Sequence, residues 1–389
     1  MTRIEQAYKE LLKTSAGGMN DASIAAAVDE FQKIDLEVNH TAEKFGYEFF
    51  PDASVHMGAY GRSRELDDSF LCHNQGAALA RFAPDQIAVV TGFGTTGSPS
   101  PGTLSMIFRL LDIQKNADIY VSTIISDFGT LNSRNTTPDA SSRLAEQFIG
   151  FIAELGFDAQ KGELRTHKNK EYCTLLPIVT SCLSSKDFDE YTEATDDQYK
   201  KLNIFRGDFA MCTYKAMMAT DILLPLVVKG KKAVVVITGL EEHYHPNFAR
   251  FVGERFKILS GGYETLLPDM FHVSAFYTKM INGFFPYAKM SRSIPGSSLC
   301  IGDSESEIIS KVRLSDKISN IVILQMMESM PGWSKMGKDE ISNAFEDEFR
   351  WKYVKEDFLE MLLGLRKKCL RCAPKKYYSF VRYAFGVHR

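Results

Sequence analysis

The stretch from residue 86 to residue 125 constrains the fold of this chain more than any other part of the sequence. It begins with a short apolar run, Gln86–Val90, which ends at Thr91-Gly92 and is typical of a buried parallel strand. A turn rich in Gly, Ser and Pro follows at 92–103, then an amphipathic helix over 104–115 and a second apolar run, Ile119–Ile125. A strand, a glycine-rich turn, a helix and another strand open a doubly wound α/β fold, so we predict a Rossmann-like parallel sheet.

The rest of the chain extends this pattern. Further strands are predicted at 163–166 and 232–239, helices at 64–79, 138–155, 246–256 and much of 170–230, and irregular backbone at 257–288. From Ser304 to the end the sequence is mostly helical in pattern. The Met-rich helix within 205–225 is explained most simply as core filling, because Met adapts to irregular packing.

Composition limits the classes of protein that this chain can belong to. With 389 residues, 44% of them apolar, it can form two or three globular domains. The net charge of −3 excludes a global basic field, so any contact with nucleic acid must come from a local patch. Seven scattered cysteines fit reduced thiols in a cytosolic protein. We see no apolar run near the 18 residues of a membrane helix and a polar N-terminus, so we expect a cytoplasmic protein with no membrane partner.

Several segments could bind phosphate groups. Lys289–Ser298 combines two cations, four hydroxyls and a Pro-Gly turn, although its composition alone favours a solvated basic loop. In the turn at 92–103, glycines permit close backbone approach and the following helix presents free N–H groups. In an open α/β sheet, ligands bind at the carboxyl ends of the strands. We therefore expect the turns after Val90, Ile125 and Ile237 to converge with the Lys289 segment.

The order of residues in these segments resembles the class I aminoacyl-tRNA synthetases, especially the archaeal and eukaryotic tryptophanyl branch. The Lys-Met-Ser-x-Ser loop of that family matches 289–293, and its Gly-Phe-x-Pro-Thr-Gly signature is similar to 92–97. The likeness continues at 57–66, 218–225, 239–250 and 299–312, and covers roughly residues 50–315. In the first signature, Ser100 and Thr103 replace the two histidines with which the family stabilises the transition state.

The resemblance implies ATP and Mg²⁺ as cofactors, a class I fold with a helical C-terminal domain, and a homodimer formed through the helix near 205–225. It implies an N-terminal helical and hairpin extension at 1–85, a nucleotide-binding catalytic domain at 86–303 with a helical insertion at about 170–230, and a helical domain at 304–389. The implied catalytic residues are Lys289, Arg292, Ser100 and Thr103. The implied nucleotide-binding residues are Gly92, Gly94, Gly102, Gly239, Glu241, Met290 and Ser291.

The amino-acid pocket departs from the family pattern. Val90 stands where the branch usually has Tyr, Ile124 replaces a polar residue, and Met218 replaces the Gln that contacts the substrate amino group. Asp127 is kept, and Glu242 replaces a Gln. These five residues are the candidate substrate-binding residues. Because a site that binds an indole N–H selects through polar partners, we expect a more apolar or differently shaped amino acid than tryptophan.

Three further features have more than one interpretation. Glu241, Glu242, His243 and His245 could form a metal cluster, but we predict no metal ligands in this protein. Cys369 and Cys372 form a lone CxxC pair, for which a zinc or redox role is the minor interpretation. The segment 366–389 is basic with interleaved aromatic residues, which fits either an RNA-contact face or a helix packed on the domain.

Taken together, these patterns favour ATP-dependent activation of an amino acid to its adenylate, followed by transfer to tRNA. One alternative is a synthetase paralogue that passes the adenylate to a small-molecule or peptide acceptor in biosynthesis. Another is a catalytically silent descendant that binds RNA or an amino acid and regulates. Exchange of pyrophosphate into ATP, and then charging of tRNA, would separate the three.

Overall fold

The computed structural model describes residues 41–50, 70–134, 136–189, 207–259, 267–268, 270–279, 281–284, 290, 296–314 and 317–373. Its described strands are β1 (Glu48–Phe49), β2 (Phe70–Asn74), β3 (Ile87–Gly94), β4 (Tyr120–Ser126), β5 (Gly162–Thr166), β6 (Ala233–Gly239) and β7 (His272–Thr278). They form one sheet in the order β1-β2-β7-β6-β3-β4-β5. Neighbouring strands from β7 to β5 run parallel, and β1 and β2 add an antiparallel edge. The predicted doubly wound α/β sheet is therefore confirmed.

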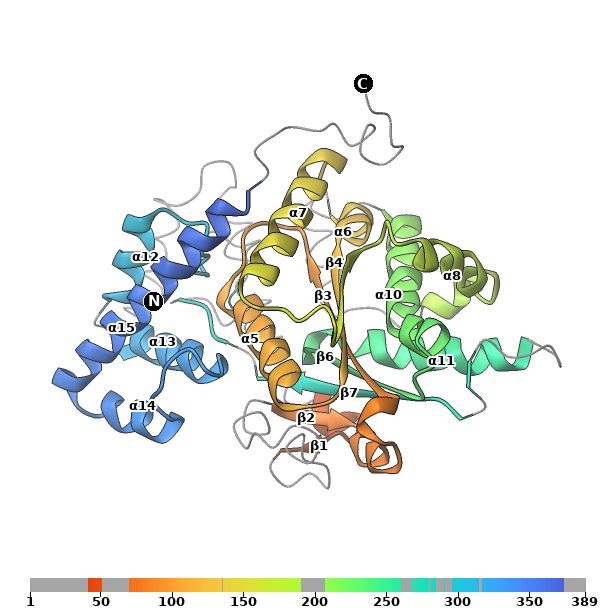
Figure 1. The fold of residues 1–389 in the computed structure, drawn as a ribbon, viewed down its shortest axis with the longest axis horizontal. Coiled ribbons are helices and arrows are strands. Elements are labelled where there is room, and N and C mark those ends of the chain that lie inside the picture. Colours follow the sequence, from red (N-terminus) through yellow and green to blue (C-terminus); the bar gives the residue numbers. More distant parts are fainter. Residues whose placement is uncertain are drawn as a thin grey trace, which may run out of the picture. The chain divides into compact units, whose positions relative to one another are not determined.

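Helices cover the sheet and form the later part of the chain (Figure 1). The described α-helices are α5 (Pro101–Asn116), α6 (Asp127–Ser133), α7 (Pro138–Glu154), α8 (Lys170–Ser181), α10 (Asp208–Val228), α11 (Tyr244–Leu259), α12 (Glu305–Val312), α13 (Lys317–Ser329), α14 (Lys338–Phe345) and α15 (Glu348–Arg371). Short 3₁₀ helices are η1 (Gly76–Arg81), η2 (Pro84–Gln86), η3 (Ser185–Phe188) and η4 (Leu240–Glu242). The helical character predicted from Ser304 onward is thus confirmed.

The chain divides into two compact units. The sheet unit contains Ala42–Thr96, Ile113–Lys279 and Cys372–Arg389, and the helical unit contains Met1–Thr41, Gly97–Asp112 and Met280–Arg371. The division crosses the glycine-rich turn between Thr96 and Gly97, and it crosses α5 between Asp112 and Ile113. The three domains expected from the sequence stay a prediction.

The order of the strands places a topological switch beside β3. From β3 the chain moves outward through β4 to β5, and it then returns as β6 on the other side of β3. In sheets of this type, ligands bind at the carboxyl ends of the strands next to such a switch. The glycine-rich turn, Asp127 and Glu241 all follow strands that end at this edge, namely β3, β4 and β6.

Three predictions about local structure are wrong. Residues 70–74, expected in a helix, form β2, and residues 272–278, expected to be irregular, form β7. β3 also continues to Gly94 and does not end near Val90. In each case a partner strand decides the conformation, because Cys72 pairs with Tyr277 and Gly94 pairs with Ser126. These pairings join residues that are distant in the sequence, and local patterns do not report them.

α10 is the most apolar helix of the sheet unit. It packs over one face of the sheet, and α7 lies on the opposite face (Figure 1). With 21 residues and a mean hydropathy of 1.4, α10 is long and apolar enough to cross a membrane, which corrects the expectation that no such segment exists. However, 67% of that window is buried within the protein, as in the core helix of a soluble domain. Met211 and Met217 are among its buried side chains, and this agrees with core filling.

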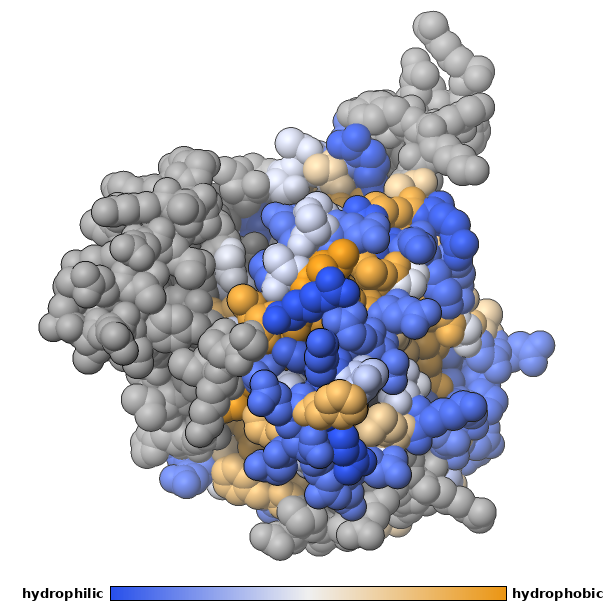
Figure 2. Space-filling model, turned by 90° about the vertical axis from the view of Figure 1, so that its left-hand side faces the viewer, coloured by the Kyte–Doolittle hydropathy of each residue, from blue (hydrophilic) through white to orange (hydrophobic). Residues whose placement is uncertain are grey.

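The helical unit is held by aromatic packing and by buried polar contacts. The rings of Trp333 and Phe358 meet edge to face, with centroids 5.0 Å apart. Trp351 Nε1 donates to Asn320 Oδ1 at 2.9 Å, and Lys355 Nζ donates to the same oxygen at 3.0 Å. The face of the molecule in Figure 2 is mostly hydrophilic, with small separate apolar patches.

Candidate functional site

The N-terminus of α5 carries the two hydroxyls that replace the family histidines. Ser100 precedes the helix, and its carbonyl accepts from Leu104 N at 2.8 Å. Ser100 Oγ lies 3.3 Å from Thr103 Oγ1 and accepts from Thr103 N at 3.5 Å. A Cβ added at Gly102 would meet nothing within 4 Å. The first turn of α5 therefore presents backbone N–H groups, two hydroxyls and a bare backbone position, a combination suited to an anionic ligand.

Within the helical unit, the residues that follow the Lys289–Ser298 segment lie against the turn before α5. Ile301 N donates to Pro99 O at 3.0 Å, and Gly302 N donates to Ser98 Oγ at 3.1 Å. A Cβ added at Gly302 would lie 2.6 Å from Ser98 Cβ, so the two backbones can approach this closely only because residue 302 is glycine. Two segments that lie 204 residues apart in the sequence are thus adjacent. The expected convergence of the turns with the Lys289 segment itself stays a prediction.

The base of the same segment is closed by backbone contacts. Phe284 N donates to Ser297 O at 2.9 Å, and Met290 N donates to Ile281 O at 3.2 Å. Lys311 Nζ, on α12, donates to Ser298 O at 2.6 Å. Lys289, Ser291 and Arg292 lie outside the described residues. α12 itself begins with the capping box predicted for Ser304 and Glu307, in which Ser304 Oγ accepts from Glu307 N at 3.2 Å.

Replacing Gly302 with Ala should separate the two motif segments. We expect a loss of about 1–3 kcal/mol in the free energy of unfolding, because the new methyl group overpacks against Ser98. If the chain has the activity that the resemblance implies, pyrophosphate exchange should fall with it, because residues 98–99 would no longer be held against 301–302. Denaturant unfolding and exchange kinetics on the same preparation measure both effects.

Two variants make this test specific. Ser98→Gly combined with Gly302→Ala should recover part of both losses, because it removes the atoms that the methyl group meets. Gly364→Ala is the matched control: it lies in α15 with open space around it, and it should raise stability by about 0.5–1 kcal/mol. If the losses of the two single variants simply add up in the double variant, the methyl group at position 302 does not act through Ser98.

In the sheet unit, the turn after β3 rests on α6. Thr95 N donates to Thr130 Oγ1 at 2.8 Å, and Thr95 Oγ1 lies 2.6 Å from Ser141 Oγ. A Cβ at Gly94 would lie 3.3 Å from Thr130 Oγ1, whereas one at Gly92 would have ordinary contacts with Ile124. The close approach at Gly94 explains why the strand ends here with a residue that has no side chain.

The turn after β6 positions the two predicted glutamates. A Cβ added at Gly239 would lie 2.7 Å from Glu241 Cδ, so the Glu241 carboxylate folds back over the glycine. Glu242 Oε2 accepts a short hydrogen bond from Thr238 Oγ1. Both carboxylates are half-buried at the carboxyl end of β6.

In the described part of the chain, neither the histidines after β6 nor the cysteines at the end of α15 are arranged as a metal site. His243 Nδ1 lies 2.9 Å from Tyr47 Oη, and its ring lies 4.7 Å from the Phe45 ring in a tilted arrangement. Burial lowers the pKa of His243 to about 4, so its imidazole is neutral at pH 7. Cys369 is buried on α15, and Cys372 Sγ lies 3.2 Å from Glu154 Oε2. Among the residues that the structure describes, no group of three His, Cys, Asp or Glu could hold a metal ion.

Three of the predicted substrate-binding residues, Val90, Ile124 and Met218, lie between the sheet and α10. Val90 pairs with Ser122 across β3 and β4, so Val90 and Ile124 point to the same face of the sheet. α10 covers that face and carries Met218. A Cβ added at Gly129 would lie 3.5 Å from Met218 Cε, and this places Met218 beside the helix that Asp127 opens. The apolar character expected for this part of the site is therefore present on its sheet and helix sides.

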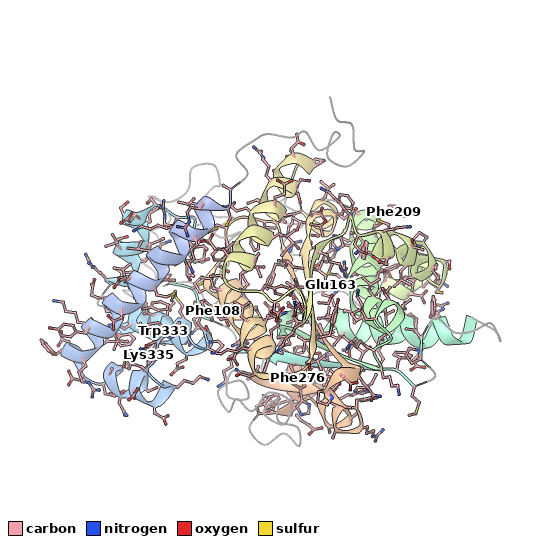
Figure 3. The ribbon with its side chains drawn as sticks, viewed as in Figure 1. Phe108, Glu163, Phe209, Phe276, Trp333 and Lys335 are labelled. Carbon is pink, nitrogen blue, oxygen red and sulfur yellow. The ribbon has the colours of Figure 1, made fainter. Side chains whose placement is uncertain are left out.

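A buried charge network borders the same face, and the sequence did not predict it. His167 Nε2 lies 2.9 Å from Asp221 Oδ2, and His167 Nδ1 lies 3.3 Å from Asp127 Oδ1. Arg165 Nη2 lies 2.9 Å from Asp221 Oδ1, and Arg165 Nε lies 3.3 Å from Glu163 Oε1 (Glu163 is labelled in Figure 3). In the sequence, Asp221 is an acidic residue within an apolar stretch of α10. Because a buried charge requires a partner, this residue could have revealed the network.

Within this network His167 carries a proton on both ring nitrogens. Burial alone would lower the pKa of His167, but the carboxylates of Asp221 and Asp127 raise it to about 9. Burial raises the pKa of Asp127, but the facing His167 overcomes this effect and lowers it. The amide of Gly129 lies 3.4 Å from His167 Nδ1, farther than the Asp127 oxygen, so the carboxylate decides the protonation of that nitrogen. Asp127 is thus fixed as a carboxylate at the end of β4.

The charge on His167 makes the stability of the protein fall at alkaline pH. Its folded pKa of about 9 lies above the ordinary value of 6.5, so the stabilisation is complete below about pH 6.5 and is lost as the pH rises through 9. This loss should amount to roughly 3 kcal/mol. Urea unfolding between pH 6 and pH 10 measures it, and His167→Gln should remove the slope.

His272→Gln provides the control. Burial lowers the pKa of His272, so its titration lies below pH 6.5 and this variant should keep the alkaline slope. An unchanged slope in His167→Gln would contradict the assignment of charge to His167.

Comparisons with known proteins agree with this geometry. The family model of the class I tRNA synthetases (W and Y) matches residues 84–320. The tryptophan–tRNA ligase 1 of Halobacterium salinarum is 27% identical over 182 residues, which are 46% of this chain and 33% of the relative. The tryptophan–tRNA ligase of Methanopyrus kandleri is 23% identical over 229 residues, 58% of this chain and 56% of the relative. The chain thus spans about a third of the length of the first relative and about half of the length of the second.

Solved structures show the same fold. The tryptophanyl-tRNA synthetase of Aeropyrum pernix K1 superposes with a TM-score of 0.63 and 16% identity, covering 90% of this chain and 100% of that one. The tyrosyl-tRNA synthetase of Aeropyrum pernix gives a TM-score of 0.56 at 14% identity, with 79% and 96% of the two chains covered. At these identities the likeness concerns the fold alone.

Proposed function

This chain belongs to the class I tRNA synthetases of the tryptophan and tyrosine family, and from this we propose that it activates the carboxylate of an amino acid with ATP and transfers the aminoacyl group to tRNA. The observation that supports the proposal is the contact of Ser98 and Pro99 with Ile301 and Gly302, which directly follow the Lys289–Ser298 segment in the helical unit. In the proposed reaction, the first turn of α5 and the Lys289–Ser298 segment must act together on the triphosphate of ATP.

In the proposed reaction the protein acts by positioning and by charge stabilisation. Lys289 and Arg292 hold the leaving pyrophosphate, and the hydroxyls of Ser100 and Thr103 donate to the phosphates together with the N–H groups of α5. The bare backbone at Gly102 receives the adenine, with Gly92, Gly94, Met290 and Ser291 shaping the nucleotide side. The amino-acid carboxylate attacks the α-phosphate, and the P–O bond to pyrophosphate breaks.

The other candidate residues line the remaining parts of the site. Glu241, held beside Gly239, approaches the ribose, and Asp127 with Glu242 lines the amino-acid side. Val90, Ile124 and Met218 form its apolar wall. Mg²⁺, which the family implies, would neutralise charge on the triphosphate of ATP.

Amino-acid-dependent exchange of pyrophosphate into ATP tests the activation step. The assay covers all proteinogenic acids and several modified ones, and we expect exchange with one or a few. Charging of total tRNA with the active acid then tests the transfer step. Absence of exchange with every acid would overturn the proposed enzyme and favour the regulatory alternative, in which the chain binds RNA or an amino acid only.

The second candidate function is transfer of the adenylate to a small-molecule or peptide acceptor. The replacement of both family histidines and of the helix Gln by Met218 favours it, because these changes separate the chain from tryptophan activation. Exchange without charging of tRNA would support this alternative. The basic residues of α15 favour tRNA: Lys367 and Lys368 lie on its last turns, and the further basic residues 375–389 lie outside the described chain.

We propose in addition that the protein is a cytoplasmic homodimer. The resemblance of the helix near 205–225 to the dimer contact of the family supports the dimer, and Phe209 at the start of α10 is 87% exposed and available for such a contact (Figure 3). Sedimentation analysis of the protein and of Phe209→Ser tests the dimer.

A further inference from the structure

The stretch at residues 298–303, where the Lys289–Ser298 segment ends, is held by cations from two helices of the helical unit. Lys311 Nζ, on α12, donates to Ser298 O at 2.6 Å. Arg366 Nε, on α15, donates to Asp303 O at 2.8 Å. Hydrogen bonds with a charged donor are among the strongest in proteins, so these two contacts fix both ends of the stretch relative to the helices.

The contact with the turn before α5 lies between these two anchors. Ile301 N donates to Pro99 O at 3.0 Å. Gly302 N donates to Ser98 Oγ at 3.1 Å. The side chains of Leu299 and Ile301 are fully buried, so the stretch cannot slide without exposing apolar surface. Each cation therefore holds one side of the place where the two motif segments meet.

The carboxylate of Asp303 links the two anchors. Asp303 Oδ2 accepts from Cys300 N at 2.9 Å, and Asp303 N donates to Cys300 O at 3.0 Å. Lys311 Nζ lies 3.7 Å from the same Asp303 oxygen. Lys311 thus balances the charge that shapes the turn at 300–303 while it donates to the carbonyl at 298.

The residues before the Lys289–Ser298 segment are anchored as well. Asn282 N donates to Gln325 Oε1, on α13, at 3.0 Å. Phe284 N donates to Ser297 O at 2.9 Å and joins the two ends of the segment. Helices α12, α13 and α15 thus hold both ends, and the two cations hold the end that meets the turn before α5.

A different kind of contact also joins α12 and α15, which pack together in the helical unit (Figure 1). Arg313, at the C-terminal end of α12, has its Nη2 2.8 Å from Glu356 Oε2, and the two side chains are 56% and 41% exposed. An exposed ion pair of this kind contributes little to stability. Arg313 thus bridges the helices through a side chain, whereas Lys311 and Arg366 bind backbone carbonyls of 298–303.

We propose that Lys311 and Arg366 are positioning residues for amino-acid activation, which hold residues 301–302 against 98–99 and so set where the Lys289–Ser298 segment ends. This inference rests on the proposed function and adds to it two residues outside the candidate site. A displacement of a catalytic group by about 1 Å can lower a rate about 10²-fold, so the anchors of the segment affect the kcat.

Lys311→Met tests the first anchor, because methionine keeps the unbranched stem and removes the ammonium. The kcat of amino-acid-dependent pyrophosphate exchange should fall about tenfold, and the KM of the amino acid should stay within about twofold, because the altered contact lies in the helical unit. Arg366→Met should give the same division between kcat and KM. Lys311→Arg should restore most of the kcat, since it keeps a charged donor. A lowered Tm with an unchanged kcat would assign the two cations a structural role and overturn the inference.

Arg313→Met is the matched control. It removes a cation between the same two helices, and it should leave the kcat at the wild-type value even if the Tm falls slightly. An equal loss of kcat in Arg313→Met and Lys311→Met would show that any loosening of α12 on α15 lowers activity, and it would overturn the inference.

Hydrogen–deuterium exchange of backbone amides separates this inference from the proposed function. If the wild type shows no pyrophosphate exchange with any acid, the proposed function fails, but the amides of 300–302 still report on the anchors. Deuterium should enter them about tenfold faster in Lys311→Met and Arg366→Met, and at the wild-type rate in Arg313→Met. Equal rates in all four proteins would overturn the inference.

Discussion

Replacing Lys289 with Met should lower the kcat of amino-acid-dependent pyrophosphate exchange by about 10²–10³-fold, the usual effect of removing one donor to developing charge. Lys289 begins the Lys-Met-Ser-x-Ser motif, and the proposed mechanism assigns its ammonium to the leaving pyrophosphate. Its charge contributes most when the P–O bond breaks, so the KM of ATP should change much less than the kcat. Steady-state exchange at saturating amino acid measures both constants.

The control for this experiment is Lys335→Met, which removes an exposed lysine of the helical unit (Figure 3). It should leave both constants unchanged, since it lies outside the motif. Equal Tm values for the two variants and the wild type would show that the loss is chemical. A Lys289→Met enzyme with wild-type kcat would remove the triphosphate role from this segment and with it the main support for adenylation.

Replacing Asp221 with Asn should lower the free energy of unfolding by about 3–5 kcal/mol, the cost of leaving buried charges without their partner. Asp221 holds His167 through one oxygen and Arg165 through the other. The amide keeps the shape of the side chain but removes its charge, so the loss reports electrostatics and not packing. Urea unfolding at pH 7 measures it.

Asp208→Asn provides the matched control on the same helix. Asp208 is exposed in the first turn of α10, where a carboxylate contributes at most about 1 kcal/mol through the helix dipole. Asp221→Asn should also lower the pKa of His167, because the charge of Asp221 is the interaction that raises this pKa most. Similar small losses for both variants would show that water or backbone groups, and not Asp221, satisfy the two cations.

The two sides of the candidate site differ in how far they depart from the family pattern. On the nucleotide side, helix α5 still begins with donors and a bare glycine, although hydroxyls replace imidazoles. On the amino-acid side, apolar residues replace the polar ones at the aligned positions, and a charge network from β5 and α10 lies next to them. The chemistry of activation needs the first side, and the choice of substrate depends on the second.

Much of the fold followed from local patterns. The apolar runs at 86–90, 119–125 and 232–239 and the glycine-rich turn predicted the central strands β3, β4 and β6, because buried parallel strands need continuous apolar residues. The capping box at Ser304 and the helices from α12 onward were also predictable, since a helix start and an amphipathic period depend on neighbours in sequence. The motifs occur in the same order as in the class I synthetases, and this order further indicated the family.

The elements that were missed depend on partners far along the chain. β2 and β7 each have a sequence with no long apolar run, and pairing between Cys72 and Tyr277 makes them strands. The contact of Gly302 with Ser98 brings two motifs together, and only the folded helical unit shows it.

The sequence by itself determined the parallel sheet, the site edge at the ends of β3, β4 and β6, and the residues that resemble the family motifs. Only the tertiary structure decided that Arg165 and His167 both pair with the Asp221 carboxylate inside the sheet unit. The physical reason is that strand and helix periods are encoded by adjacent residues. Burial, charge state and unpaired hydrogen-bonding groups instead depend on which distant side chains the fold brings within a few ångströms.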